Sequence, residues 1–171
     1  MKSREQLVKD ALELAKNTVP MPELLDFSLK KARKLAEIYD GDADIIIIAM
    51  SLMDLKIKDA KEAGKIEMHT DMAVLFAGDF LKDYDLTNKE VDKIINCIEA
   101  HHGAVPYGSI EAEICANADC YIFIHPIGVF AYERLLERRG IVFIEQIKQL
   151  NFKLQEKYKL QFEPFSSMYS K

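Results

Sequence analysis

The sequence predicts a single-domain, all-α protein. Two observations lead to this prediction: apolar residues recur at the three- and four-residue spacing of amphipathic helices along nearly the whole chain, and no segment offers a second strand for a sheet. The 171 residues are enough for one domain with a sizeable core, and the balance of 49% hydrophobic and 30% charged residues is that of an ordinary globular protein.

The first two predicted helices are amphipathic stretches separated by prolines. The first covers residues 4–16, and Pro20 and Pro22 then break the pattern because proline cannot continue a helix. The second covers residues 24–39 and ends at the turn-forming stretch 40–42. The apolar residues of the first helix fall on one face: Leu7, Ala11, Leu14 and Ala15.

Residues 43–55 are apolar enough to form a central helix. The β-branched run Ile45–Ile48 is also compatible with a strand. We favour a helix because the apolar run continues to Leu52, beyond the usual length of a strand, and because its neighbours are helical. The charged segment 56–66 is expected to form a loop.

Helical periodicity continues in the second half of the chain. Thr87 and Glu90 form a capping-box pattern, which predicts that a helix starts there and runs into His101 and His102. The other helices are expected over residues 69–83, 110–123, 128–138 and 141–160. The polar tail 163–171 is expected to fray.

Composition restricts the partners and the compartment. A net charge of −5 argues against nucleic acid as the main partner, because nucleic-acid binding usually needs a basic face. The N-terminal residues lack the apolar core of a signal peptide, and no apolar run approaches the ~18 residues of a transmembrane helix. We interpret the cysteines, which show no CxxC spacing, as reduced thiols of a cytoplasmic protein: Cys97, Cys115 and Cys120.

The candidate metal ligands are histidines and aspartates at helix ends. His69 opens one predicted helix, His101 and His102 end another, and Asp54 and Asp119 are carried by apolar helices. Imidazole nitrogens and carboxylate oxygens together suit Mn, Fe, Co, Ni or Zn. The spacing alone leaves a metal site open, because no local pattern such as His-Glu-x-x-His is present.

The order of these residues resembles the HD-domain superfamily of metal-dependent phosphohydrolases, over roughly residues 22–140. The resemblance is carried by the segments "DIIIIAMSLMDLK", "HTDMAVLFAGDFL", "EAHHG" and "NADCYIFIHPIG". It implies a single HD-like helical bundle, with an N-terminal helix and turn (1–21), the HD core (22–140), and a C-terminal helix and tail (141–171). It also implies hydrolysis of a phosphate ester or nucleotide by a metal-bound water.

The resemblance assigns roles to individual residues. Asp54 falls on the aspartate of the family's His-Asp pair, and Lys30 lies where family members often carry an arginine that could reach a substrate phosphate. We therefore predict Asp54 and Asp119 as catalytic residues and Lys30 as a substrate-binding residue. The predicted metal ligands are Asp54, His69, His101, His102 and Asp119.

Three positions depart from the family pattern. Phe27 and Met53 stand where histidines are expected, and Asn117 replaces an aspartate. Phenylalanine cannot bind a metal, and a thioether is a soft ligand that does not suit a hard hydrolytic metal. The resemblance thus allows one divalent ion (Mn, Fe, Ni, Co, Zn or Mg) or none. A non-catalytic relative that keeps the fold for ligand binding or protein interaction is an open alternative. A metal-dependent oxygenase is another, since two histidines and a carboxylate also hold iron.

Simpler roles stay open for several of these residues. Asp54 could be solvated or paired with Lys56 or Lys58. Because adjacent helix residues do not share a face, one of His101 and His102 is expected to face solvent. His125 is interpreted as a structural or surface residue. The expected partner is a small phosphorylated molecule or nucleotide. A homo-oligomer is also open, because the last helix could pack on a second subunit.

Overall fold

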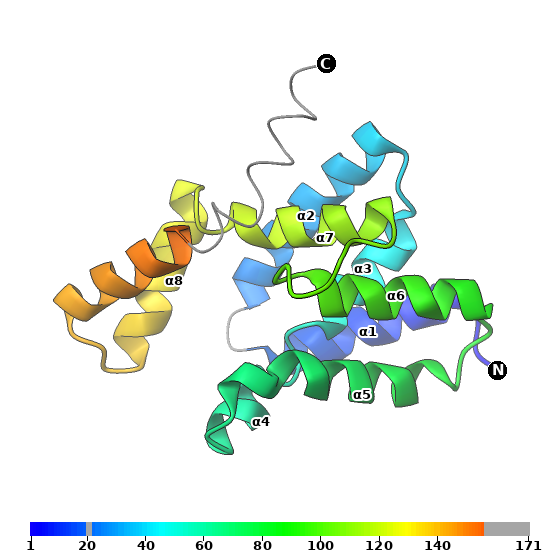
Figure 1. Cartoon of the computed structure of the whole chain (residues 1–171), viewed down its shortest axis with the longest axis horizontal. Helices are drawn as coiled ribbons and strands as arrows, with labels where there is room; N and C mark the ends of the chain where they lie inside the picture. The colour runs from blue at the N-terminus through cyan, green and yellow to red at the C-terminus, as the bar shows by residue number, and fades with distance from the viewer. Residues whose placement is uncertain (20–21, 156–171) are drawn as a thin grey trace.

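The computed structural model describes residues 1–19 and 22–155, and within these ranges the chain is helical with no strand (Figure 1). The all-α prediction is therefore confirmed. The elements are α1 (Arg4–Thr18), α2 (Pro22–Tyr39), α3 (Ala43–Leu52), α4 (Ile57–Glu62), the short 3-10 helix η1 (Ile66–Met68), α5 (His69–Leu81), α6 (Asn88–Ala100), α7 (Ile110–Tyr121) and α8 (Pro126–Arg138). Residues 143–155 are also helical, whereas the rest of the predicted last helix and the tail 163–171 lie outside the described residues.

Helix α3 is the centre of the core. All residues from Ile45 to Leu52 are buried, and α1, α2, α6 and α7 pack around them. The side chain of Asp42 caps the start of α3 by accepting hydrogen bonds from the backbone N–H groups of Asp44 and Ile45. The helical interpretation of the isoleucine run is therefore confirmed. The helix ends at Leu52, three residues earlier than expected, so that Asp54 lies in the turn that follows it.

The prediction of a loop over residues 56–66 is wrong, because α4 and η1 lie there. Lysine, glutamate and alanine favour helices, and α4 is supported by ion pairs at helical spacing. Lys56 pairs with Asp59 at 2.8 Å and Lys58 pairs with Glu62 at 3.9 Å. The high charge of the segment marks an exposed helix and not an irregular loop.

A bend between α7 and α8 turns the end of the described chain away from the core. Helix α8 begins at Pro126, two residues earlier than expected, because proline is well tolerated in the first turn of a helix. Its N-cap is His125, whose side chain accepts a hydrogen bond from the N–H of Ile127. Figure 1 shows α8 and the helical residues 143–155 at one side of the molecule, away from α1 and α6. No single helix among the described residues is long and apolar enough to cross a membrane, and α7 and α8 meet that criterion only as a pair bent by 68°.

The N-terminus is tied to the core through Asp10. Its carboxylate accepts hydrogen bonds from Lys2 at 2.8 Å and from the hydroxyl of Tyr84 at 2.7 Å. The Lys2 ammonium, together with the Tyr84 and Gln6 donors, lowers the pKa of Asp10 to about 2. The three cysteines are all buried and none forms a disulfide, in line with the interpretation as reduced thiols.

Candidate metal centre

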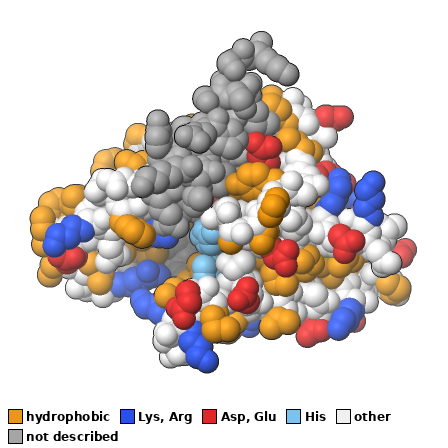
Figure 2. All heavy atoms as spheres, viewed as in Figure 1, with side chains coloured by type: hydrophobic (Ala, Val, Ile, Leu, Met, Phe, Trp, Pro, Cys, Tyr) orange, Lys and Arg blue, Asp and Glu red, His pale blue; other side chains and the backbone are white. Residues whose placement is uncertain are grey.

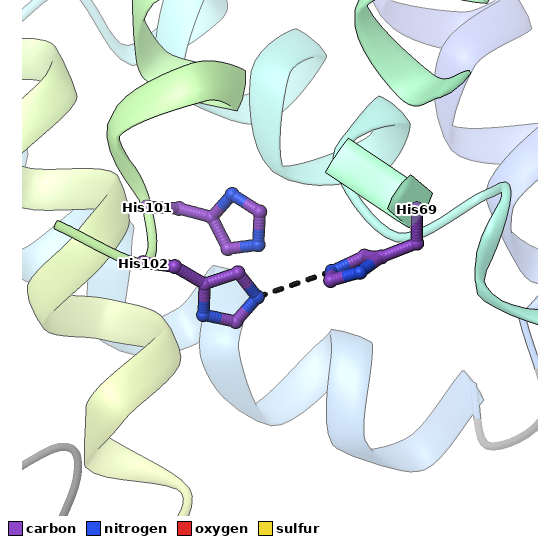
Figure 3. Close-up of side chains that lie close together, drawn as sticks. All are labelled: His69, His101 and His102. Carbon is purple, nitrogen blue, oxygen red and sulfur yellow. Dashed lines mark hydrogen bonds between the residues drawn. The ribbon is translucent and has the colours of Figure 1, made fainter. Parts of the chain in front are cut away.

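Three histidines from two helices meet beside the core (Figure 3). His69 is the first residue of α5, and His101 and His102 directly follow α6. One ring nitrogen from each histidine lies within 4.8 Å of the others. The Nε2 atoms of His69 and His102 are 3.1 Å apart. Two nitrogens bound to one ion at about 2.05 Å, with an angle between 90° and 110°, lie about 2.9–3.4 Å apart, so this separation suits a shared ion.

Backbone carbonyls orient two of the three rings. The Nδ1 atom of His69 lies 2.7 Å from the carbonyl oxygen of Ile66, and that of His101 lies 2.6 Å from the carbonyl oxygen of Ile98. Because a carbonyl oxygen can only accept, Nδ1 carries the proton in both rings and Nε2 is left with its lone pair. This is the tautomer and the type of outer partner that metal-binding histidines have.

Asp54 reaches the cluster from the turn after α3. Its Oδ1 atom lies 3.9 Å from Nε2 of His101, whose side chain is fully buried. This separation is within the about 4.2 Å that two ligands on opposite sides of one ion can span. Lys56 and Lys58, which follow Asp54 in the sequence, pair with Asp59 and Glu62.

The expectation that one of His101 and His102 faces solvent holds in part, because His102 is the more exposed of the two and lines the cavity, although both rings belong to the cluster. His101 is fully buried, His102 is half-buried, and their ring centroids lie 3.9 Å apart. Both residues follow the last residue of α6, where the chain turns into Gly103 with a φ of 71°. The angular offset of about 100° between neighbours in a continuous helix therefore does not separate their side chains.

A cavity of about 280 Å³ opens beside the histidines. Its polar groups include the side chains of Asp54, His69 and His102, together with Asp119 from α7, which is 7% exposed. Histidine side chains reach the surface near the middle of the view in Figure 2. The structure thus brings all five predicted ligands to one place: three histidines in contact, Asp54 next to His101, and Asp119 in the lining of the same cavity.

Two of the three departures from the family pattern, Met53 and Phe27, differ in their position relative to the cavity. Met53 is buried and lines the cavity next to Asp54. Phe27 is not part of the described lining, and its ring packs against His125 at 4.8 Å and Tyr121 at 6.0 Å between centroids. The polar side chain that α2 contributes to the cavity is Ser28, whose hydroxyl donates to the carbonyl of Leu24.

The positively charged side chains that line the cavity do not include Lys30, the predicted substrate-binding residue. Lys30 is exposed on α2 and is not part of the described lining. Its neighbour Lys31 lies over the ring of Tyr121, 4.1 Å from the centroid. Arg139 and Lys153 line the cavity instead. Sequence reasoning missed both, because each is one of many charged residues on exposed helices and only the bend before α8 brings them to the site.

His125 has a structural role, as expected. It caps α8 and packs between Phe27 and Tyr121, outside the described lining of the cavity. Comparisons with protein-family models, with curated proteins and with solved structures found no match. The resemblance to the HD-domain superfamily therefore stays a prediction from the order of residues, and the candidate metal site rests on the geometry of the three histidines.

Proposed function

We propose that this protein is a metal-dependent phosphohydrolase that acts on a small phosphate ester or nucleotide. The observation that carries the proposal is the cluster of His69, His101 and His102 with Asp54 beside it, at the wall of a cavity large enough for a small organic molecule. Three imidazoles and one carboxylate leave coordination positions open on a five- or six-coordinate ion.

The ligand set also indicates the class of metal. Three imidazole nitrogens favour Zn, Co, Ni or Fe over Mg, which prefers oxygen ligands and near-octahedral geometry. Such an ion polarises a phosphoryl oxygen and lowers the pKa of a bound water. The residues of the chain supply the rest: Asp54 completes the ligand set, and the carboxylate of Asp119 accepts a hydrogen bond from the attacking water and orients it.

A non-catalytic ligand-binding role is the second candidate. It is favoured by Met53, which occupies the cavity wall beside Asp54 with a thioether where a further hard ligand would complete a two-metal site. Both candidate functions include a metal bound by the histidines, but only the first includes hydrolysis of a phosphate ester.

The test is metal binding and turnover on the same preparations. The protein is stripped of metal and reloaded separately with Zn, Co, Ni, Mn and Mg. Bound metal is then measured, and hydrolysis of p-nitrophenyl phosphate, bis(p-nitrophenyl) phosphate and nucleoside monophosphates is assayed. We expect one ion per chain for Zn, Co or Ni and a loss of turnover of about 100-fold or more in Asp54→Asn. His69→Ala is expected to lose the ion.

The matched control is His125→Asn. It removes a histidine outside the cavity lining and keeps a residue that caps helices well, so metal content and turnover should match the wild type. One bound ion with no turnover on any ester would support the second candidate. Absence of bound metal from the wild-type protein would reject both.

A further inference from the structure

We propose that the cavity selects an amphiphilic organic phosphate, in which an anionic group bound by Arg139 is joined to an apolar body and not to a polyol such as a sugar. This inference rests on the proposed function, because it names the substrate class of the same site. It is drawn from the position of an arginine and a mostly apolar lining in one cavity with the histidine cluster.

Most of the surface that lines the cavity is apolar. Helix α2, helix α3 and the turn after α3 contribute apolar side chains to it: Leu24, Leu25, Met50 and Met53. Phe123 and Tyr132 contribute aromatic rings that pack edge to face, with centroids 5.2 Å apart. A polyol placed against the apolar part of this lining would lose hydrogen bonds to water, whereas an aryl or alkyl group would gain contact area.

Arg139 gives this cavity a site for an anion. It follows the last residue of α8 and is part of the described lining of the cavity. No acidic side chain among residues 1–19 and 22–155 pairs with it. A planar guanidinium can bind two oxygens of one phosphate, which an ammonium group cannot do in the same way.

The charge of the cavity favours an anion once a metal is bound. The acidic residues of the described lining are Asp54 and Asp119, and a divalent ion offsets both. The positive charge of Arg139 then remains in the lining, in a chain whose net charge is −5. A concentration of positive charge in an apolar cavity attracts and orients an anionic ligand more strongly than the same charge on open surface.

The test uses phosphonates, because their carbon–phosphorus bond is not hydrolysed by a phosphatase and binding can be measured at equilibrium. Phenylphosphonate has an apolar body, 2,3-dihydroxypropylphosphonate has a polyol, and benzyl alcohol has no anionic group. Isothermal titration calorimetry on the zinc-loaded protein should show phenylphosphonate binding at least about tenfold more tightly than either of the other two compounds.

The role of Arg139 is tested with Arg139→Gln against its neighbour Arg138→Gln. Both arginines are exposed at the end of α8, but only Arg139 is part of the described lining. Arg139→Gln should weaken phenylphosphonate binding about tenfold or more while metal content and melting temperature stay those of the wild type. Arg138→Gln should change binding less than about twofold.

Equal affinity for the two phosphonates, or an unchanged affinity in Arg139→Gln, would overturn the inference. The failure of the proposed function gives a different result. If no metal binds at the histidines but phenylphosphonate still binds in a way that depends on Arg139, the proposed ligand class is supported and the proposed hydrolase function is rejected. If metal and turnover are present but neither the apolar body nor Arg139 affects binding, the hydrolase function is supported and the proposed ligand class is rejected.

Discussion

Met53 lies beside Asp54 in the lining of the cavity, where an imidazole could add a further metal ligand. Met53→His should therefore raise the affinity for Zn or Co by about tenfold, or add a second bound ion. Phe27→His is the matched comparison, because Phe27 packs on Tyr121 and His125 outside the described lining and should leave metal binding unchanged. Chelator competition measures both variants, and a gain in Phe27→His without one in Met53→His would contradict the geometry.

The positions of the histidines and aspartates can be compared with those predicted from the sequence. The resemblance to the HD-domain superfamily, and not the spacing alone, led to the prediction that Asp54, Asp119 and three histidines share a site. The structure groups the histidines and places Asp54 beside His101, and Asp119 lines the neighbouring cavity. The direction in which a single helical side chain points was harder to predict. An offset of one position rotates a helical side chain by about 100°, and this is why Ser28 and not Phe27 lines the cavity from α2.

At the scale of elements, the junction of α7 and α8 depends on Gly128. A Cβ atom added there would lie 2.2 Å from the backbone carbonyl oxygen of Ile122, which cannot move without disturbing the end of α7. Gly128→Ala should therefore destabilise the protein by about 1–3 kcal/mol. It should also weaken phosphonate binding, because α8 carries Tyr132 and leads to Arg139.

The control for Gly128→Ala is Gly78→Ala in α5. A Cβ atom at Gly78 meets no other atom within 4 Å, and alanine favours a helix more than glycine does. We expect this variant to be more stable than the wild type by up to about 1 kcal/mol in urea unfolding. If both variants shifted stability in the same direction, the close approach at Gly128 would not be the cause.

The hydrogen bond of Asp10 in α1 to Tyr84, which follows α5, should make the stability of the protein depend on pH. The pKa of Asp10 is about 2 in the folded chain and 3.8 ordinarily, so folding is favoured by the ionised form. This stabilisation is fully present well above pH 3.8 and is lost as the pH falls through about 2. The difference in melting temperature between the wild type and Asp10→Asn should be constant from pH 5 to 7 and shrink toward pH 2, when measured by circular dichroism. A difference that is independent of pH over the whole range would contradict this assignment.

Element boundaries could be predicted where a cap marks them and less well elsewhere. The capping box of Thr87 and Glu90 is present as predicted. Helix α4 was missed because its charges were interpreted as a sign of a loop, although the ion pairs they form stabilise an exposed helix.

At the scale of the whole molecule, the fold class could be predicted from periodicity alone, since an amphipathic stripe requires a partner surface wherever it occurs. The cavity could not be predicted. It forms where α2, α3, α5, α7 and α8 come together, and α7 and α8 are bent by 68° at a break where Gly128 packs closely on the backbone of Ile122.

We propose that His69, His101 and His102 together hold one metal ion. X-ray absorption spectroscopy of the zinc-loaded protein tests it most directly, because imidazole ligands give a distinct multiple-scattering pattern. We expect three imidazole nitrogens at about 2.0–2.1 Å from the zinc, with oxygen ligands completing the shell. We also expect bound zinc to be lost in His69→Ala but not in His125→Asn. Sulfur ligands from the buried cysteines, or a shell with one imidazole or none, would contradict it.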